Sequence, residues 1–114
     1  MSTSSNTIPK PEDYAPFHLE AFYRLERDKG SDFANATIDS ALVTYTRDTM
    51  TNKLKHAAKQ GHKNWWKKED CSIDDLKELH AKHVDKGEFL DAGIFAMFIH
   101  ARQCAEFLEQ EGES

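Results

Sequence analysis

Four polar residues between positions 80 and 91 have the types and spacing of a metal or acid–base site. Glu88 and Asp91 lie three residues apart at the start of an apolar segment, and His80 and His83 lie three apart just before it. Residues three apart on a helix share a face. Because a short connection makes consecutive helices antiparallel neighbours, His83 should lie opposite Glu88 and His80 opposite Asp91. The spacing thus predicts two imidazoles facing two carboxylates.

A second acidic pair, Asp75 and Glu78, precedes these histidines on the same predicted helix. Carboxylates on neighbouring helices are how helical bundles hold divalent cations. Oxygen ligands suit Mg²⁺ or Mn²⁺, and added imidazoles favour iron or zinc. The predicted site has four metal-binding carboxylates, two candidate additional imidazole ligands and two candidate phosphate-binding lysines: Asp75, Glu78, Glu88 and Asp91; His80 and His83; Lys82 and Lys86.

A purely structural interpretation accounts for the same acids. Glu88 and Asp91 fall in the first turn of a predicted helix, where a negative side chain contributes about 0.3 to 1 kcal/mol by interacting with unpaired N–H groups. Asp75 follows Ser72 by three residues, the spacing of a capping box, and Glu78 then is a solvated acid. The sequence leaves both interpretations open.

Apolar periodicity predicts four helices that position these residues. They cover residues 16–29, 31–60, 73–85 and 88–109, with Gly30, Gly61 and Gly87 at their ends and Ser31 or Asp32 as the cap of the second. Four threonines between positions 44 and 51 make a bend near Asp48 the alternative to one long second helix. No strand pattern is present, so we expect an all-α fold, a small four-helix bundle.

Composition limits the classes of protein that this chain can belong to. At 114 residues it should form one domain, residues 13–111, preceded by a disordered arm, residues 1–12, that is rich in Ser, Thr, Asn and Pro. No apolar run reaches the roughly 18 to 20 residues that cross a bilayer, and no export signal is visible. We therefore expect a cytoplasmic protein without a membrane partner. The net charge of −5 argues against nucleic acid as the main ligand.

Two features of the sequence point to further contacts. The last predicted helix is apolar over more than half its circumference. Leu90, Phe95 and Phe98 therefore cannot all face one small core. A second copy of the chain is the simplest cover, which predicts a homo-oligomer.

The segment 53–68 is locally basic and suits either an anionic ligand or a solvated helix end. Cys71 precedes a helix start, where the helix dipole can lower a thiol pKa.

The C-terminal half resembles a group of small bacteriophage and prophage proteins. The segments GHKNWW and CSIDDLKELHAKHVDKGEFLDAGIFAMFIHARQ carry the resemblance, and the upstream YTRDTMTNKL is similar to the same group. The similarity extends over roughly residues 42–103. It implies a phage-encoded protein that works in the host cytoplasm.

A more distant resemblance is to the all-α MazG-like nucleotide pyrophosphohydrolases. That superfamily holds Mg²⁺ with an E-x-x-E motif on one helix and an E-x-x-D motif on the next. Glu88 and Asp91 in EFLD match the second motif, whereas Asp75 and Glu78 in DDLKE stand for the first, with Asp in place of Glu. The resemblance implies a Mg²⁺-dependent protein that binds a nucleoside triphosphate or hydrolyses it between the α and β phosphates.

The competing hypothesis is a non-catalytic interaction protein. In that case the chain is a small helical oligomer that binds and inhibits a host protein or sequesters a small signalling molecule. The apolar surface of the last predicted helix and the acidic C-terminal segment EQEGES favour it. The first hypothesis predicts a bound nucleotide, whereas the second predicts a host protein or a small signalling molecule as the ligand.

Overall fold

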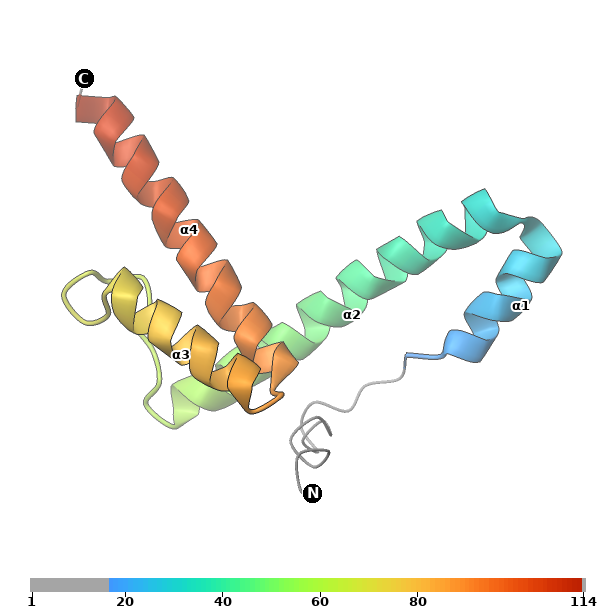
Figure 1. Cartoon of the computed structure of the whole chain (residues 1–114), viewed down its shortest axis with the longest axis horizontal. Helices are drawn as coiled ribbons and strands as arrows, with labels where there is room; N and C mark the ends of the chain where they lie inside the picture. Colours follow the sequence, from blue (N-terminus) through green and yellow to red (C-terminus); the bar gives the residue numbers. More distant parts are fainter. Residues whose placement is uncertain (1–16, 114) are drawn as a thin grey trace.

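The predicted all-α fold with four helices is confirmed. The computed structural model describes residues 17–113, so the arm predicted for residues 1–12 lies outside the described residues. The helices are α1 (Leu19–Lys29), α2 (Ser31–Lys59), α3 (Ile73–Asp85) and α4 (Phe89–Glu113), as Figure 1 shows. No strand occurs within residues 17–113, and no helix there is long and apolar enough to cross a membrane.

The first two helices form a hairpin around a single glycine. Gly30 ends α1 with a φ of 94°, and α2 begins at the next residue. The predicted cap at Ser31 or Asp32 is therefore wrong: Gly30 occupies the cap position, and no side chain caps α2. The Phe17 ring packs against Phe22 and Tyr45, with centroid distances of 5.4 and 5.2 Å. These ring contacts hold the start of the hairpin against α2.

The second helix runs unbroken through its threonine-rich centre. Thr49 is buried, and its hydroxyl donates to the Tyr45 carbonyl at 2.9 Å; the Thr51 hydroxyl donates to the Arg47 carbonyl at 2.7 Å. Each hydroxyl thus shares a carbonyl four residues earlier with the helix backbone, so it is satisfied inside the helix without breaking it. The expected single long helix is confirmed, and no bend interrupts it at Asp48.

The third helix begins with the predicted capping box. The Ser72 hydroxyl accepts a hydrogen bond from the Asp75 N–H at 3.0 Å, and the Asp75 carboxylate accepts one from the Ser72 N–H at 3.3 Å. Two helix-start donors are satisfied in this way. This cap fixes the first turn of α3 and accounts for the acid at position 75.

The four helices form an open bundle of two pairs. α1 packs on the first half of α2, α3 packs on α4, and the second half of α2 passes beneath the start of α4, so that α2 and α4 diverge as the arms of a V (Figure 1). Leu76, Ala92 and Ile94 are buried at the junction. Ala34 is the one buried apolar residue of the described α1–α2 pair. The core therefore sits at the base of the V.

A buried arginine fixes the loop between α2 and α3. Arg102 of α4 is 5% exposed, and its guanidinium donates to the carbonyls of Trp65 at 2.9 Å and Cys71 at 2.7 Å. The Trp65 ring stacks on Phe98, with centroids 4.4 Å apart and planes within 6°. These contacts tie both ends of the loop to one side of α4.

Replacement of this arginine should destabilise the fold strongly. Arg102→Met leaves the Trp65 and Cys71 carbonyls without their charged donor, so we expect the free energy of unfolding to fall by about 2 to 3 kcal/mol. Urea denaturation measures the change. Arg47→Met, at an exposed arginine of α2, is the matched control and should change it by no more than about 0.5 kcal/mol. Equal losses in the two variants would show that Arg102 does not hold the loop.

Candidate metal centre

The turn between α3 and α4 brings the end of one helix against the start of the next. The Glu88 N–H donates to the His83 carbonyl at 2.9 Å, and the Gly87 N–H donates to the Val84 carbonyl at 3.0 Å. This pair of bonds is the Schellman motif, which needs a left-handed residue, and Gly87 has a φ of 75°. The backbone turn alone thus places Glu88 next to His83.

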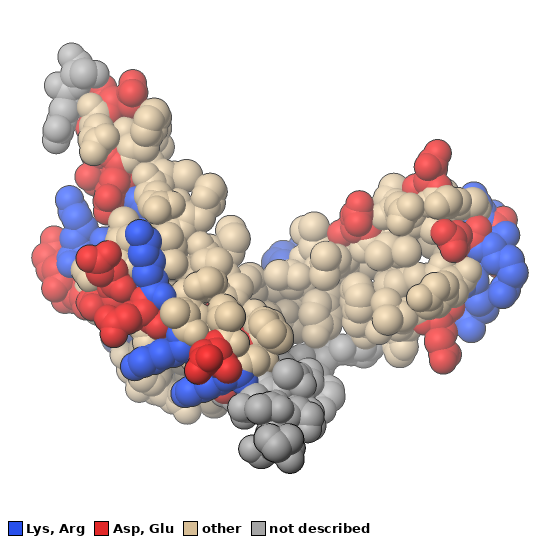
Figure 2. Space-filling view, in the orientation of Figure 1, with Lys and Arg blue, Asp and Glu red and all other residues tan. Residues whose placement is uncertain are grey.

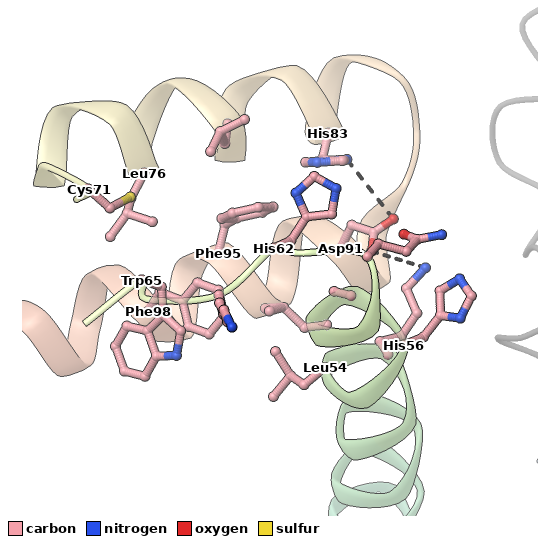
Figure 3. Close-up of a pocket in the computed structure, with 16 residues that line it drawn as sticks. Leu54, His56, His62, Trp65, Cys71, Leu76, His83, Asp91, Phe95 and Phe98 are labelled. Carbon is pink, nitrogen blue, oxygen red and sulfur yellow. Dashed lines mark ion pairs between the residues drawn. The ribbon is translucent and has the colours of Figure 1, made fainter. Parts of the chain in front are cut away.

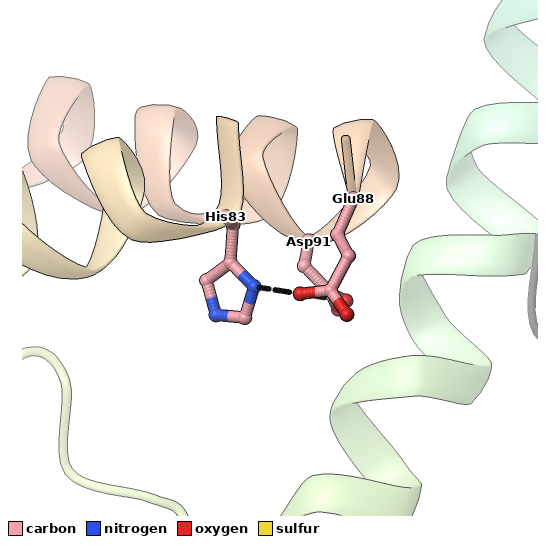
Figure 4. Close-up of side chains that lie close together, drawn as sticks. All are labelled: His83, Glu88 and Asp91. Atoms are coloured by element: carbon pink, nitrogen blue, oxygen red, sulfur yellow. Dashed lines mark hydrogen bonds and ion pairs between the residues drawn. The ribbon is translucent and has the colours of Figure 1, made fainter. Parts of the chain in front are cut away.

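The side chains of His83, Glu88 and Asp91 converge beside this turn (Figure 4). His83 Nδ1 lies 2.7 Å from Glu88 Oε1 and 4.0 Å from Asp91 Oδ2. One ligand atom from each of the three residues lies within 4.8 Å of the other two. All three side chains are half-buried. We call His83, Glu88 and Asp91 the cluster.

A row of stacked rings fixes the orientation of the histidine. The His83 imidazole stacks on Phe95, with centroids 5.1 Å apart and planes within 13°. Phe95 meets Phe98 edge-on at 5.6 Å, and Phe98 in turn stacks on Trp65. The stack holds the plane of the imidazole in an orientation in which Nδ1 points at Glu88.

The second helix contributes a cation to the cluster. Lys53 Nζ lies 3.1 Å from Asp91 Oδ1, and the two side chains are only 11% and 17% exposed. This ion pair joins α2 to the first turn of α4. It also places a positive charge in the wall of the adjoining cavity.

A cavity of about 650 Å³ opens next to the cluster (Figure 3). Its walls come from α2, α3, α4 and the loop that carries Trp65. Phe95, Phe98 and Trp65 form an apolar side, and basic residues of α2 and the loop border it together with His83 and Asp91: Lys53, His56, His62 and Lys63. The volume is within the range of about 300 to 1,000 Å³ that small-molecule sites occupy.

The structure brings some of the predicted site residues together and leaves others apart. Within residues 17–113, the cluster is the one group of three or more candidate ligands close enough to share an ion. Asp75 serves the α3 cap and Glu78 is exposed, so the first acidic pair does not join it. His80 is half-buried outside the cavity lining.

The predicted phosphate-binding lysines also lie elsewhere. Lys82 and Lys86 are exposed and do not line the cavity. The cavity instead has Lys53 and Lys63, which sequence analysis did not single out as ligand-binding residues. Both fall in the segment 53–68, whose local basic character was the available signal.

Comparisons with known proteins do not identify a function for this site. No protein-family model matches this chain. No curated protein or solved structure is significantly similar to it either. The arrangement of the cluster and the cavity therefore carries the functional argument.

The thiol at the far side of the cavity is not activated. Burial raises the pKa of Cys71, and the negative charge of Asp75 raises it further, although the Arg102 guanidinium opposes both effects. This direction is opposite to the lowering of the pKa that a position before a helix start could have caused, and it agrees with a bystander thiol. Cys71 is protonated at neutral pH and is a wall of the cavity rather than a nucleophile.

The turn glycine should be costly to replace. Gly87→Ala forces a side chain into the left-handed region, so we expect the free energy of unfolding to fall by about 1 to 2 kcal/mol. Gly112→Ala is the control because this helical glycine has open space around it, and it should be neutral or slightly stabilising. Denaturant titration compares them. A neutral Gly87→Ala would mean that the turn tolerates another conformation.

The raised pKa of Cys71 predicts slow alkylation. In a Cys104→Ser variant, the thiolate fraction of Cys71 at pH 8 should be lower in the folded protein than in the unfolded chain, because folding raises the pKa. Iodoacetamide labelling followed by mass spectrometry gives the two rates, and we expect at least a severalfold difference. Faster labelling of the folded protein would contradict the assigned environment.

Proposed function

We propose that this protein binds a nucleoside triphosphate together with a divalent cation and hydrolyses it between the α and β phosphates. The convergence of His83, Glu88 and Asp91 at the edge of a cavity with aromatic and cationic walls is the observation that supports it. The proposal extends the resemblance of EFLD to the MazG-like enzymes and places the protein in the cytoplasm of a phage-infected host.

The donor set of the cluster fits a divalent cation. Two carboxylates supply hard oxygen ligands, as Mg²⁺ and Mn²⁺ require, and the imidazole of His83 adds a nitrogen ligand that favours Mn²⁺ over Mg²⁺. The ring stack beneath His83 and the ion pair between Lys53 and Asp91 act as supports for the ligands. A bound cation would polarise a phosphate and lower the pKa of a water molecule.

The cavity walls suit the other parts of a nucleotide. The side formed by Trp65, Phe95 and Phe98 offers apolar contact to a base. Lys53 and Lys63 lie where they would neutralise phosphate oxygens. In the proposed reaction, water attacks the α phosphorus, the bond to the bridging oxygen breaks, pyrophosphate leaves and a carboxylate of the cluster accepts the proton.

Thermal unfolding with added Mn²⁺ tests the cation site. At a concentration one hundred times the Kd, a bound cation should add about 2.7 kcal/mol to the free energy of unfolding. The wild-type midpoint should therefore rise, and that of Glu88→Gln/Asp91→Asn should not. The charge-matched control Asp74→Asn/Glu78→Gln, at exposed acids of α3, should respond as wild type does. An equal response of all three proteins would place the cation elsewhere.

Release of pyrophosphate tests the reaction separately. With Mn²⁺ or Mg²⁺ and each common nucleoside triphosphate, the wild type and the Asp74→Asn/Glu78→Gln control should release pyrophosphate, whereas Glu88→Gln/Asp91→Asn should be inactive. Cation and nucleotide binding without any release would end the enzymatic part of the proposal and leave a nucleotide-binding protein.

The exposed apolar surface favours a second candidate function. Met97, Phe107 and Leu108 of α4 are each more than half exposed, which is unusual for a helix with an apolar face. A non-catalytic protein that binds a host factor or sequesters a small molecule would have such a surface. Failure of all triphosphates to bind or react, with an intact fold, would favour this second function.

A further inference from the structure

Apolar residues follow a heptad spacing along the whole of α4. Their separations alternate between four and three residues, which is the pattern of a helix that packs lengthwise on another helix. Six residues form this stripe: Leu90, Ile94, Met97, Ala101, Cys104 and Leu108. We call them the α4 stripe.

The described residues cover only the start of this stripe, at Leu90 and Ile94. Ile94 is 7% exposed, because the start of α4 lies against α2 and α3. From Met97 onward the stripe is bare: Met97 is 54% exposed and Leu108 is 68% exposed. The apolar heptad spacing thus continues for about three turns beyond Ile94, the last covered residue of the stripe.

Ile94 of the stripe lines the cavity together with Lys53, Leu54 and Ala57 of α2, which places the stripe on the side of α4 that faces α2. Figure 2 shows an uncharged surface on the side of α4 that faces the other arm, whereas acidic and basic groups gather on its outer side. Several residues of α4 outside the stripe are polar, among them Gln103, Glu106, Glu109 and Gln110, although Phe89 and Phe107 also lie outside it and are 63% and 60% exposed. A helix that is amphipathic in this way requires a second apolar surface.

We propose that a second copy of this chain covers the bare stripe, with α4 of one copy packed antiparallel on α4 of the other. A heptad stripe is complementary to itself, so a two-fold axis across it pairs each Met97 with the other copy's Leu108 and each Ala101 with the other copy's Cys104. The small residues Ala101, Cys104 and Ala105 lie at the centre and allow the two helices to approach closely. This inference does not depend on the proposed function.

Charge favours the antiparallel arrangement. The C-terminal end of α4 is acidic, with Glu106, Glu109 and Glu111, whereas the end of α2 that lies beside the start of α4 carries Lys53, Lys55 and Lys59. An antiparallel pair separates the two acidic ends and brings each one toward the basic end of the other copy's α2. A parallel pair would place like charges side by side.

The exposed apolar area is of the size that a dimer needs. Leu42 of α2 lies eleven residues, about three turns, before Lys53 and therefore on the side of α2 that faces the V. Leu42, Met97, Phe107 and Leu108 are each at least half exposed. A buried aromatic side chain covers roughly 150–250 Å², so we take about 100 Å² of exposed apolar area for each of these half-exposed residues. Together they supply about half of the roughly 800 Å² that each partner buries in a standard interface.

The remainder is available on the same chain. Further apolar side chains are exposed on the α1–α2 pair: Leu19, Tyr23, Phe33 and Val43. Among the described residues none of α1 is buried, so a further contact would stabilise this helix. A second α4 lying in the V would contact both arms.

Sedimentation velocity of the full chain tests this dimer. Over micromolar concentrations the wild type should sediment with twice the chain mass of 13.1 kDa. Ala101→Glu puts a charge at the centre of the stripe and should weaken dimerisation at least about tenfold, whereas Gln103→Glu adds the same charge on the outer face and should not. Both positions are exposed in one chain, so circular dichroism should show that both variants stay folded.

The labelling of Cys104 provides a second measurement. In a Cys71→Ser background, iodoacetamide should label Cys104 slowly at high protein concentration and faster on dilution or in the Ala101→Glu variant. A wild-type protein of single-chain mass at all concentrations would overturn the proposal and leave the stripe to a different partner. So would Ala101→Glu and Gln103→Glu proteins of equal mass, or Cys104 labelling that does not depend on concentration.

Discussion

The left-handed turn at Gly87 is the constraint on which the candidate site depends. It reverses the chain so tightly that the Glu88 N–H bonds to the His83 carbonyl, and the same two residues then meet again through their side chains. Asp91 joins them because it lies one turn further along α4. A chelating arrangement thus arises from one local motif, and the aromatic stack and Lys53 fix it from outside.

The same turn determines how much of the chain can form a core. It pairs α3 with α4 over the length of α3, which is 13 residues, whereas α4 continues to Glu113 over 25 residues. Within the described residues, the loop between α2 and α3 contacts this excess length through Arg102 and Glu109, but Phe107 and Leu108 remain exposed. The site and the uncovered stripe are therefore two consequences of one topology: a short helix folded back on a long one, with α2 crossing at their common base.

Local signals explain what the sequence could predict. Glycine stops, the Ser72–Asp75 capping box and the apolar period each act within a few residues, so the helices and the opposition of His83 and Glu88 could be anticipated. The pairing of Lys53 with Asp91 could not, because it depends on where α2 crosses α4. Asp75 illustrates a different limit: an acid at that spacing suits a cap or a metal equally well, and only the three-dimensional structure shows which contacts it makes.

A crystal structure of the protein grown with Mn²⁺ and a non-hydrolysable nucleoside triphosphate analogue is the sharpest test of the proposed cation site. Data collected at the manganese absorption edge locate the cation independently of any assumption about its ligands. The account predicts an anomalous peak bound by His83, Glu88 and Asp91, with the phosphates directed toward Lys53. A peak at another site, or none beside this cluster at saturating Mn²⁺, would contradict it and leave these acids as the start of a helix.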